Sequence, residues 1–332
     1  MALASHAGHQ GHLAISNWVE RPEPSGDAVA SGVGCLRSLP RPSRQWVTAV
    51  AEQSEKAAVR EKFTSERRKW HESYASTAYP ALGLQWRQAN GVALCRTTIA
   101  EGGRILEVGC GAGHASVELA RTGYEVVGVD ISQPMIDQAT ANAADAGVSH
   151  QTHFAATDFG YLGSGEHGSF DGVLGLGFIE YFDDPASVLR QCRELLNPGG
   201  VVVIQFWNPR PAAARWIDPL LLRLRSLLRP FETIRRHRAR RPGEHPERSP
   251  QAPAVVDTDG VTHRRYTPAM AEQLAAAAGL SPVTSAGSLF FSRRTPIADL
   301  RKAWLDLVLQ RIAARSMWVR RQATDYILAS RA

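Results

Sequence analysis

Residues 104–132 decide the fold of this chain, and they read RILEVGCGAGHASVELARTGYEVVGVDIS. The stretch begins with a short apolar run of strand length and continues through a glycine cluster into a helical pattern. Gly123 stands where a left-handed helix cap is expected, and a second strand follows at 125–129. The pattern therefore predicts one strand–loop–helix–strand unit of an α/β fold, with Asp130 just beyond the second strand.

The glycine cluster and Asp130 together indicate a site for a nucleoside. Glycines let the backbone approach a bulky ligand, and a carboxylate at a strand tip can accept hydrogen bonds from both ribose hydroxyls. The glycines are spaced G-x-G-x-G, and Glu107 lies two residues before the first. A pyrophosphate prefers helix amides without a nearby carboxylate, so a cationic ligand suits this loop better than a nicotinamide or flavin dinucleotide. An NAD(P)-dependent oxidoreductase remains the alternative.

The run EVGCGAG resembles motif I of the class I S-adenosylmethionine (SAM)-dependent methyltransferases with a type 11/25-like domain, and VGVDIS resembles their second motif. The resemblance implies SAM as the cofactor, with the glycine loop under its amino-acid part and the acid after the second strand at its ribose. The residues implied in SAM binding by this stretch are Glu107, Gly109, Cys110, Gly111, Gly113 and Asp130.

Two later segments extend the resemblance. THFAATDF at 152–159 predicts a strand ending in an acid, which in the family accepts the adenine amino group; this implies Asp158, flanked by Thr157 and Phe159. A turn or helix cap is the alternative role for that acid. Ile131 and Met135 are placed to pack on the adenine ring.

The segment FDGVLGLGFIEYFDDP at 170–185 resembles the family's fourth strand and the loop after it. The apolar run 173–179 predicts a fully buried parallel strand. Gly175 and Leu176 are expected to line the cofactor cleft through their backbones. Tyr181 stands where the family commonly has histidine, which puts in doubt a proton-accepting role for this position, because tyrosine ordinarily titrates near ~10.

The order of elements predicts a doubly wound, Rossmann-like α/β fold with a mostly parallel seven-stranded sheet whose last strand is antiparallel. The fifth strand is expected at 201–207 after the turn LNPGG, the sixth at 282–291 and the last at 323–329. Thr267 and Pro268 are expected to begin a helix over 269–278. Helical insertions are expected after the fifth strand, within 208–260, and after the sixth, at about 297–313.

The chain divides into three parts by composition. Residues 1–44 are rich in Gly, Ser, Pro, Ala and His and are expected to be a disordered tail. Residues 45–100 predict helices at 46–74 and 84–98, which the resemblance identifies as a lid over SAM and substrate. Within the lid, Tyr74, Tyr79 and Arg87 are candidates to meet the SAM carboxylate, and plain helix packing is the alternative. Residues 101–332 form the predicted methyltransferase domain, with a basic helical and Pro-rich insertion at 208–260.

The net charge and the cysteines limit the expected cellular location and binding partners of the protein. The net charge is +6, the four cysteines are scattered, and no apolar run reaches membrane-spanning length. No signal-peptide pattern is seen at the start, so a cytoplasmic protein is expected. The basic amphipathic segment 214–241 suits peripheral contact with the inner membrane surface, and the alternatives are a lid over an acidic substrate or a helical cap packed on the body. No metal constellation and no RNA-binding module are found in the sequence, so neither a metal nor nucleic acid is expected.

The predicted activity is methyl transfer from SAM to a small-molecule or lipid-like acceptor by direct in-line displacement. SAM carries an activated methyl group, so orientation is the main task of the protein and no base is compulsory. His263 and Tyr266 are the candidate bases for an oxygen or carbon acceptor. A non-catalytic SAM-binding protein at the membrane surface is the second alternative. The acceptor and the oligomeric state are not predicted.

Overall fold

The computed structural model describes residues 44–66, 76–162, 170–209, 253–258, 261–291 and 298–332, together with positions 68, 72–74 and 211. The predicted disordered tail, except its last residue, lies outside the described residues. So does the basic segment 214–241 for which membrane contact is predicted.

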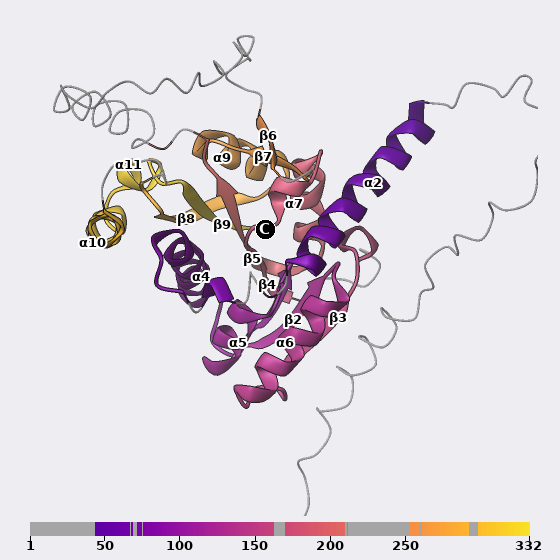
Figure 1. Ribbon diagram of the computed structural model, residues 1–332, viewed down its shortest axis with the longest axis horizontal. Helices are drawn as coiled ribbons and strands as arrows, with labels where there is room; N and C mark the ends of the chain where they lie inside the picture. Colours follow the sequence, from indigo (N-terminus) through magenta and orange to yellow (C-terminus); the bar gives the residue numbers. More distant parts are fainter. Residues whose placement is uncertain are drawn as a thin grey trace, which may run out of the picture.

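One seven-stranded sheet forms the centre of the molecule, in the order β3-β2-β1-β4-β5-β9-β8 (Figure 1). The first five strands pair in parallel, and β9 runs antiparallel to both of its neighbours. The predicted doubly wound sheet with one antiparallel last strand is therefore confirmed. The strands are β1 (Arg104–Val108), β2 (Glu125–Asp130), β3 (Thr152–Ala156), β4 (Phe170–Gly175), β5 (Leu196–Trp207), β8 (Ser281–Ser288) and β9 (Asp325–Arg331).

Helices cover both faces of this sheet (Figure 1). On one face, α4 (Tyr79–Thr98), α5 (His114–Arg121) and α6 (Gln133–Asp145) contribute to one apolar cluster. On the other face, α7 (Pro185–Glu194) and α9 (Pro268–Ala277) contribute to a second. Neighbouring strand residues alternate between the clusters, as a two-period strand requires: Ile105 belongs to the first and Leu106 to the second. Both faces of the sheet are thus buried.

Local signals in the sequence explain where several helices begin and end. Gly113 at the start of α5 has φ 71° and Gly123 just after it has φ 95°, the left-handed conformation that glycine adopts without steric cost. The Thr267 hydroxyl accepts a hydrogen bond from the Met270 amide (3.3 Å), and Pro268 occupies the first turn of α9. The predicted caps of these two helices are confirmed.

The bounds of the N-terminal helices differ from those expected. α2 (Arg44–Ser65) ends earlier than the predicted helix over 46–74, and α4 begins at Tyr79 rather than at 84. Two ion pairs tie α2 to the body: Lys56 Nζ lies 2.9 Å from an Asp158 oxygen, and Arg264 Nη1 lies 3.4 Å from a Glu55 oxygen. α2 is therefore held across the carboxyl ends of the strands.

Several expectations about strand extents are wrong, including that for the sixth strand, β8, which ends at Ser288 rather than at 291. β4 ends at Gly175, because Gly177 adopts φ 69° and a 3-10 turn, η2 (Ile179–Tyr181), follows. β3 ends at Ala156, and a second 3-10 turn, η1 (Phe159–Tyr161), begins after Asp158. The end of the expected Pro-rich loop forms a strand, β6 (Ala254–Thr258), which pairs antiparallel with β7 (Val261–Arg265).

The insertion after the sixth strand is helical, as predicted. It consists of α10 (Asp299–Ala313) and α11 (Met317–Arg320), which lie beyond edge strand β8 (Figure 1). Asp306 of α10 accepts hydrogen bonds from the Tyr79 hydroxyl and from the Phe290 amide, the latter at 2.6 Å. The insertion is thus fixed to α4 and to the segment after β8.

Candidate cofactor and acceptor site

A cavity of about 1520 Å³ lies at the carboxyl ends of the parallel strands. Pockets for a single small ligand are usually about 300–1,000 Å³, so this one has room for a cofactor and an acceptor together. Most of the residues singled out in the sequence line it: Tyr74, Arg87, Glu107, Gly109, Cys110, Gly111, Asp130, Ile131, Met135, Thr157, Asp158, Phe159, Leu176 and His263. The structure thus brings residues from seven separate segments to one place.

Three predicted site residues do not line this cavity. A Cβ atom on Gly113 would lie 2.9 Å from Ala139 Cβ, so this glycine allows α5 and α6 to approach each other. A Cβ atom on Gly175 would lie 2.7 Å from Ile204, within the core between β4 and β5. Tyr266 is 2% exposed and packs on Phe206, with ring centroids 5.9 Å apart. The two glycines serve packing, and Tyr266 is withdrawn as a candidate base.

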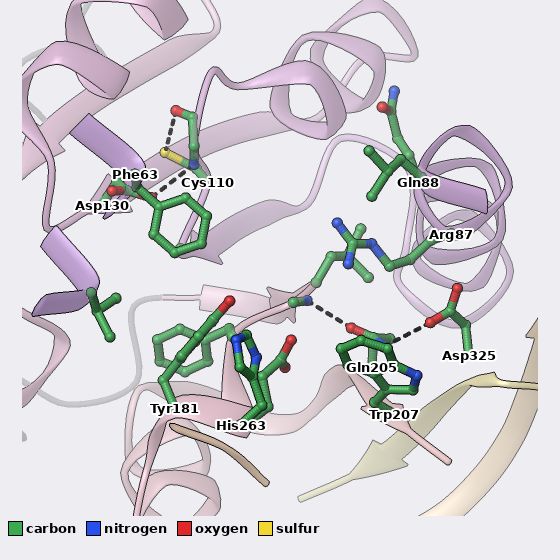
Figure 2. Close-up of a pocket in the computed structure, with 18 of the residues that line it drawn as sticks. Phe63, Arg87, Gln88, Cys110, Asp130, Tyr181, Gln205, Trp207, His263 and Asp325 are labelled. Carbon is green, nitrogen blue, oxygen red and sulfur yellow. Dashed lines mark hydrogen bonds between the residues drawn. The ribbon is translucent and has the colours of Figure 1, made fainter. Parts of the chain in front are cut away.

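Asp130 and the glycine loop form a connected structure at one end of the cavity (Figure 2). The Asp130 carboxylate accepts a hydrogen bond from the Gly111 amide through one oxygen and from the Ser132 amide through the other, both at 2.9 Å. Burial raises the pKa of Asp130, while these amides oppose the rise. Apart from its two chain neighbours, no described residue has an atom within 4 Å of the Cβ position of Gly111, so this part of the loop leaves open space. The arrangement fits a sugar with vicinal hydroxyls.

Glu107 places a second carboxyl group beneath the loop. It is 4% exposed and accepts a hydrogen bond from the Ser116 hydroxyl. Burial raises its pKa to about 7, the Ser116 hydrogen bonds lower it, and the charge of Asp130 raises it again. A ligand cation beside this group would favour its ionised form. The site therefore suits a positively charged ligand.

Asp158 performs the capping role that the sequence left open as an alternative. Its carboxylate accepts a hydrogen bond from the Gly160 amide (2.9 Å) at the start of η1, and it pairs with Lys56 of α2. It also lines the cavity, next to Thr157 and Phe159. The contact with an adenine amino group stays a prediction.

Arg87 enters the cavity from α4 (Figure 2). A Cβ atom on Gly177 would lie 2.9 Å from its Nη1, so the absence of a side chain there makes room for the guanidinium. Burial lowers the pKa of Arg87, but Tyr74, Asp325 and Glu180 more than offset this and the pKa is raised. Among the described residues, none accepts a hydrogen bond from the buried Arg87 Nε, and the guanidinium lines the cavity, where it can bind a carboxylate of a ligand.

Another part of the cavity lining is aromatic, and the sequence reading largely missed it; Figure 2 shows that it begins with Phe63 beside Asp130. The centroid of the Tyr181 ring lies 5.8 Å from that of Phe63 and 5.1 Å from that of His263. The centroids of the His263 and Trp207 rings are 6.2 Å apart. Figure 2 shows Tyr181 and His263 next to each other. The Arg265 guanidinium stacks over Trp207 at 4.1 Å. We call Phe63, Tyr181, Trp207 and His263 the aromatic wall.

A buried polar chain joins β4, β5 and β9 near Arg87 (Figure 2). The Gly177 amide donates to Gln205 Oε1 (2.8 Å), and Gln205 Nε2 donates to an Asp325 oxygen (3.0 Å). Burial raises the pKa of Asp325 to about 6 and that of Glu180 to about 7, and the Arg87 charge lowers both. The expected topology could have identified Asp325. An antiparallel last strand begins at the edge of the sheet where its parallel neighbour ends, and Asp325 at the start of β9 is opposite Trp207 at the end of β5.

Membrane-spanning helices and metal clusters are both absent from the described residues. No helix in that part of the chain is long and apolar enough to cross a membrane. Among the same residues, no group of three histidine, cysteine, aspartate or glutamate side chains is placed to hold a metal ion.

Comparisons with known proteins agree with this geometry. A family model described as a methyltransferase domain matches residues 85–251, half of the chain. The ubiquinone biosynthesis O-methyltransferase of Xanthomonas axonopodis pv. citri (strain 306) is 34% identical over 112 residues, which cover 34% of this chain and 46% of that protein. The match thus spans about half the length of this curated relative.

Two solved structures share the fold. The 1,6-didemethyltoxoflavin-N1-methyltransferase of Burkholderia thailandensis, with bound S-adenosylhomocysteine, has a TM-score of 0.52 at 14% identity and covers 89% of this chain and 92% of its own. The magnesium protoporphyrin IX methyltransferase of Synechocystis PCC 6803 has a TM-score of 0.52 at 17% identity, covering 83% and 99%. Since the family model accounts for half of the sequence and the strand order matches the predicted fold, the chain belongs to the class I SAM-dependent methyltransferase family.

Proposed function

We propose that this protein transfers the methyl group of SAM to a hydroxyl of a small, mainly apolar aromatic acceptor. The observation that carries the proposal is one cavity that runs from the loop beside Asp130 to the aromatic wall. SAM, when bound, supplies an activated methyl group on a sulfonium. The residues of the chain then have to hold both ligands, orient the acceptor oxygen and exclude water.

The residues at the loop end fit SAM by their chemistry. Asp130 would accept hydrogen bonds from the ribose hydroxyls, and Glu107 would face the ammonium group. Arg87 lines the cavity and would bind the carboxylate through its guanidinium. Ile131 and Met135 would flank the adenine ring. α2 would act as the lid, because its residues Lys56 and Phe63 line the cavity.

The aromatic wall supports an aromatic acceptor, because aromatic rings pack on one another at centroid distances of about 4.5–7 Å. The relatives of this chain in ubiquinone biosynthesis are named O-methyltransferases, which supports oxygen as the methylated atom. His263 is 7% exposed and lines the cavity, so its imidazole would take the hydroxyl proton. Burial raises the pKa of Tyr181, which keeps it protonated and able to donate a hydrogen bond rather than act as a base.

The direct test is product analysis with methyl-labelled SAM and matched aromatic compounds that carry a hydroxyl, an amine or a thiol. We expect a methyl ether and an equal amount of S-adenosylhomocysteine. Methylation of the amine or thiol alone would show that the atom is assigned wrongly. SAM binding without any product across a broad panel would favour the non-catalytic alternative.

Asp130→Ala is expected to weaken SAM binding by about 1–3 kcal/mol, because the variant removes a charged acceptor and leaves the Gly111 and Ser132 amides without their partner. Isothermal titration calorimetry would measure the change. Asp137→Ala, on the exposed side of α6 and bonded to Gln133, is the matched control and should bind SAM as the wild type does. Equal affinity for the Asp130 variant would mean that the ribose site is elsewhere.

SAM affinity is expected to rise with pH through the titration of Glu107. With a pKa of about 7, this group is mostly protonated at pH 6, whereas a bound cation favours its ionised form. Binding therefore releases a proton at low pH, and the affinity should rise roughly eightfold between pH 6.0 and 7.5. Calorimetry in two buffers would count the protons released. Glu107→Gln should lose most of this pH dependence of the SAM affinity. An unchanged pH dependence would mean that Glu107 does not interact with the ligand.

A further inference from the structure

The outer face of α10 and α11 carries large apolar side chains that no other described element covers. Leu300, Trp304 and Leu307 follow one another at helical spacing and are 87%, 64% and 48% exposed. Ile312 is also exposed, as are Met317 and Trp318 of α11. We call these six residues the outer patch. Two exposed tryptophans on neighbouring helices are unusual for a surface that faces only water.

The opposite face of α10 accounts for its attachment to the body, so the outer patch is not needed for packing. Lys302 and Asp306 are 3% and 0% exposed on that inner face. Asp306 holds the Tyr79 hydroxyl and the Phe290 amide, and Lys302 lies 5.3 Å from the centre of the Tyr79 ring. The inner face of α10 is thus fixed to the protein by Lys302 and Asp306 and by apolar residues such as Leu305, and a second, apolar stripe is turned away from it.

Charge around the outer patch is positive. Arg301, Arg311 and Arg315 are exposed beside it. Of the two acids on α10, Asp306 is buried and Asp299 pairs with Lys302 at 3.2 Å. A second copy of the chain docked through the same patch would bring these arginines against their equivalents, which costs energy. An anionic surface would complement them.

From this combination we propose that the outer patch docks on a lipid bilayer that contains anionic lipids. Tryptophan, leucine and isoleucine would enter the boundary between headgroups and acyl chains, and the arginines would contact the headgroup phosphates. The patch lies on an edge of the molecule beyond β8 (Figure 1), so a flat surface can reach it. This contact is distinct from the one predicted for 214–241.

The position of the patch also connects it with the cavity. Tyr79 and Phe291, which the inner face of α10 supports, both line that cavity. Docking would therefore bring the side of the cavity lined by Tyr79 and Phe291 close to the bilayer. An apolar acceptor would enter the cavity from the bilayer. This second step rests on the proposed function, whereas the docking itself does not.

Vesicle flotation of the full chain tests the proposal, with phosphatidylcholine vesicles and with vesicles that also contain phosphatidylglycerol. We expect the wild type to float mainly with the latter. The double variant Trp304→Ser, Trp318→Ser should lose roughly tenfold or more in partitioning for each side chain removed from lipid contact. Arg311→Gln with Arg315→Gln should lose about fivefold per arginine, on the anionic vesicles only.

Val283→Ser is the matched control, because Val283 is an apolar side chain on β8, 50% exposed and outside the patch. It should float as the wild type does. Failure of the wild type to float would overturn the proposal, as would a tryptophan variant that floats unchanged. The proposal would also be overturned if the wild type were a dimer in sedimentation and the tryptophan variant a monomer, because the outer patch would then be covered by a second copy of the chain. SAM titrations of the same proteins report on the proposed function independently of these outcomes.

Discussion

Gly111→Val is expected to abolish SAM binding while the chain stays folded. Gly111 has φ 52° and lines the cavity, and apart from its two chain neighbours no described residue has an atom within 4 Å of its Cβ position. The two methyl groups of valine would therefore fill space that the ligand needs rather than press on the protein. Since neither the loop nor a bound nucleoside can give way easily, the affinity should fall roughly hundredfold or more. Calorimetry with SAM and S-adenosylhomocysteine would measure the loss.

Gly147→Val separates this effect from backbone strain. Gly147 has φ 71°, its Cβ position also faces open space, and it lies after α6 on the outside of the molecule. Both variants should lose about 1–2 kcal/mol of stability, because a side chain is disfavoured in the left-handed region. Only the Gly111 variant should lose SAM. If both bind SAM normally, the loop does not hold the cofactor, and the assignment of the site is wrong.

The parallel part of the sheet was predictable because its signals are local. A short β-branched run, a glycine turn and an amphipathic helix follow one another within 104–132, and the resulting register pairs Val108 with Val129 in adjacent strands. That register places Gly109, just after β1, and Asp130, the last residue of β2, at one edge of the sheet. The cofactor end of the cavity could therefore be assigned from the sequence almost residue by residue.

The errors arise where distant segments decide the outcome. β4 was expected to continue to 179, because Leu176, Phe178 and Ile179 are apolar. It stops at Gly175 since the Gly177 amide is held by Gln205 of β5. Likewise, Gly113 and Gly175 belong to the motifs but contact Ala139 and Ile204 from other elements. A glycine in a motif can serve the ligand or the packing, and one sequence alone does not distinguish the two.

The acceptor end was poorly predicted for the same reason. Phe63 comes from α2, Trp207 from the end of β5 and His263 from β7, a strand in a hairpin that the sequence reading treated partly as loop. No local pattern links these segments. His263 was found only as a histidine near the expected cleft, and Tyr266, three residues later, was paired with it. The β7 strand ends between them, and Tyr266 turns into the core.

His263→Gln is expected to lower kcat roughly 10²–10⁴-fold, the usual contribution of a positioned base, with little change in SAM affinity. Glutamine keeps a polar side chain of similar reach but cannot take the proton. His150→Gln, at an exposed histidine outside the cavity, should leave kcat unchanged. Steady-state rates with a phenolic acceptor identified by product analysis would measure both. Equal rates for the His263 variant and the wild type would remove the imidazole from the reaction.

Glu180 is the competing base, and its variant decides between the two. Its carboxyl group lines the cavity with a pKa of about 7, and one of its oxygens is buried without a hydrogen-bond partner. Burial raises the pKa of this carboxyl group, but the positive charges of Arg87 and Arg265 favour its ionised form, so protonation would cost the attraction to two arginines. Glu180→Gln should therefore reduce kcat less than His263→Gln does. The reverse order would assign the proton transfer to Glu180 and leave His263 a place in the aromatic wall only.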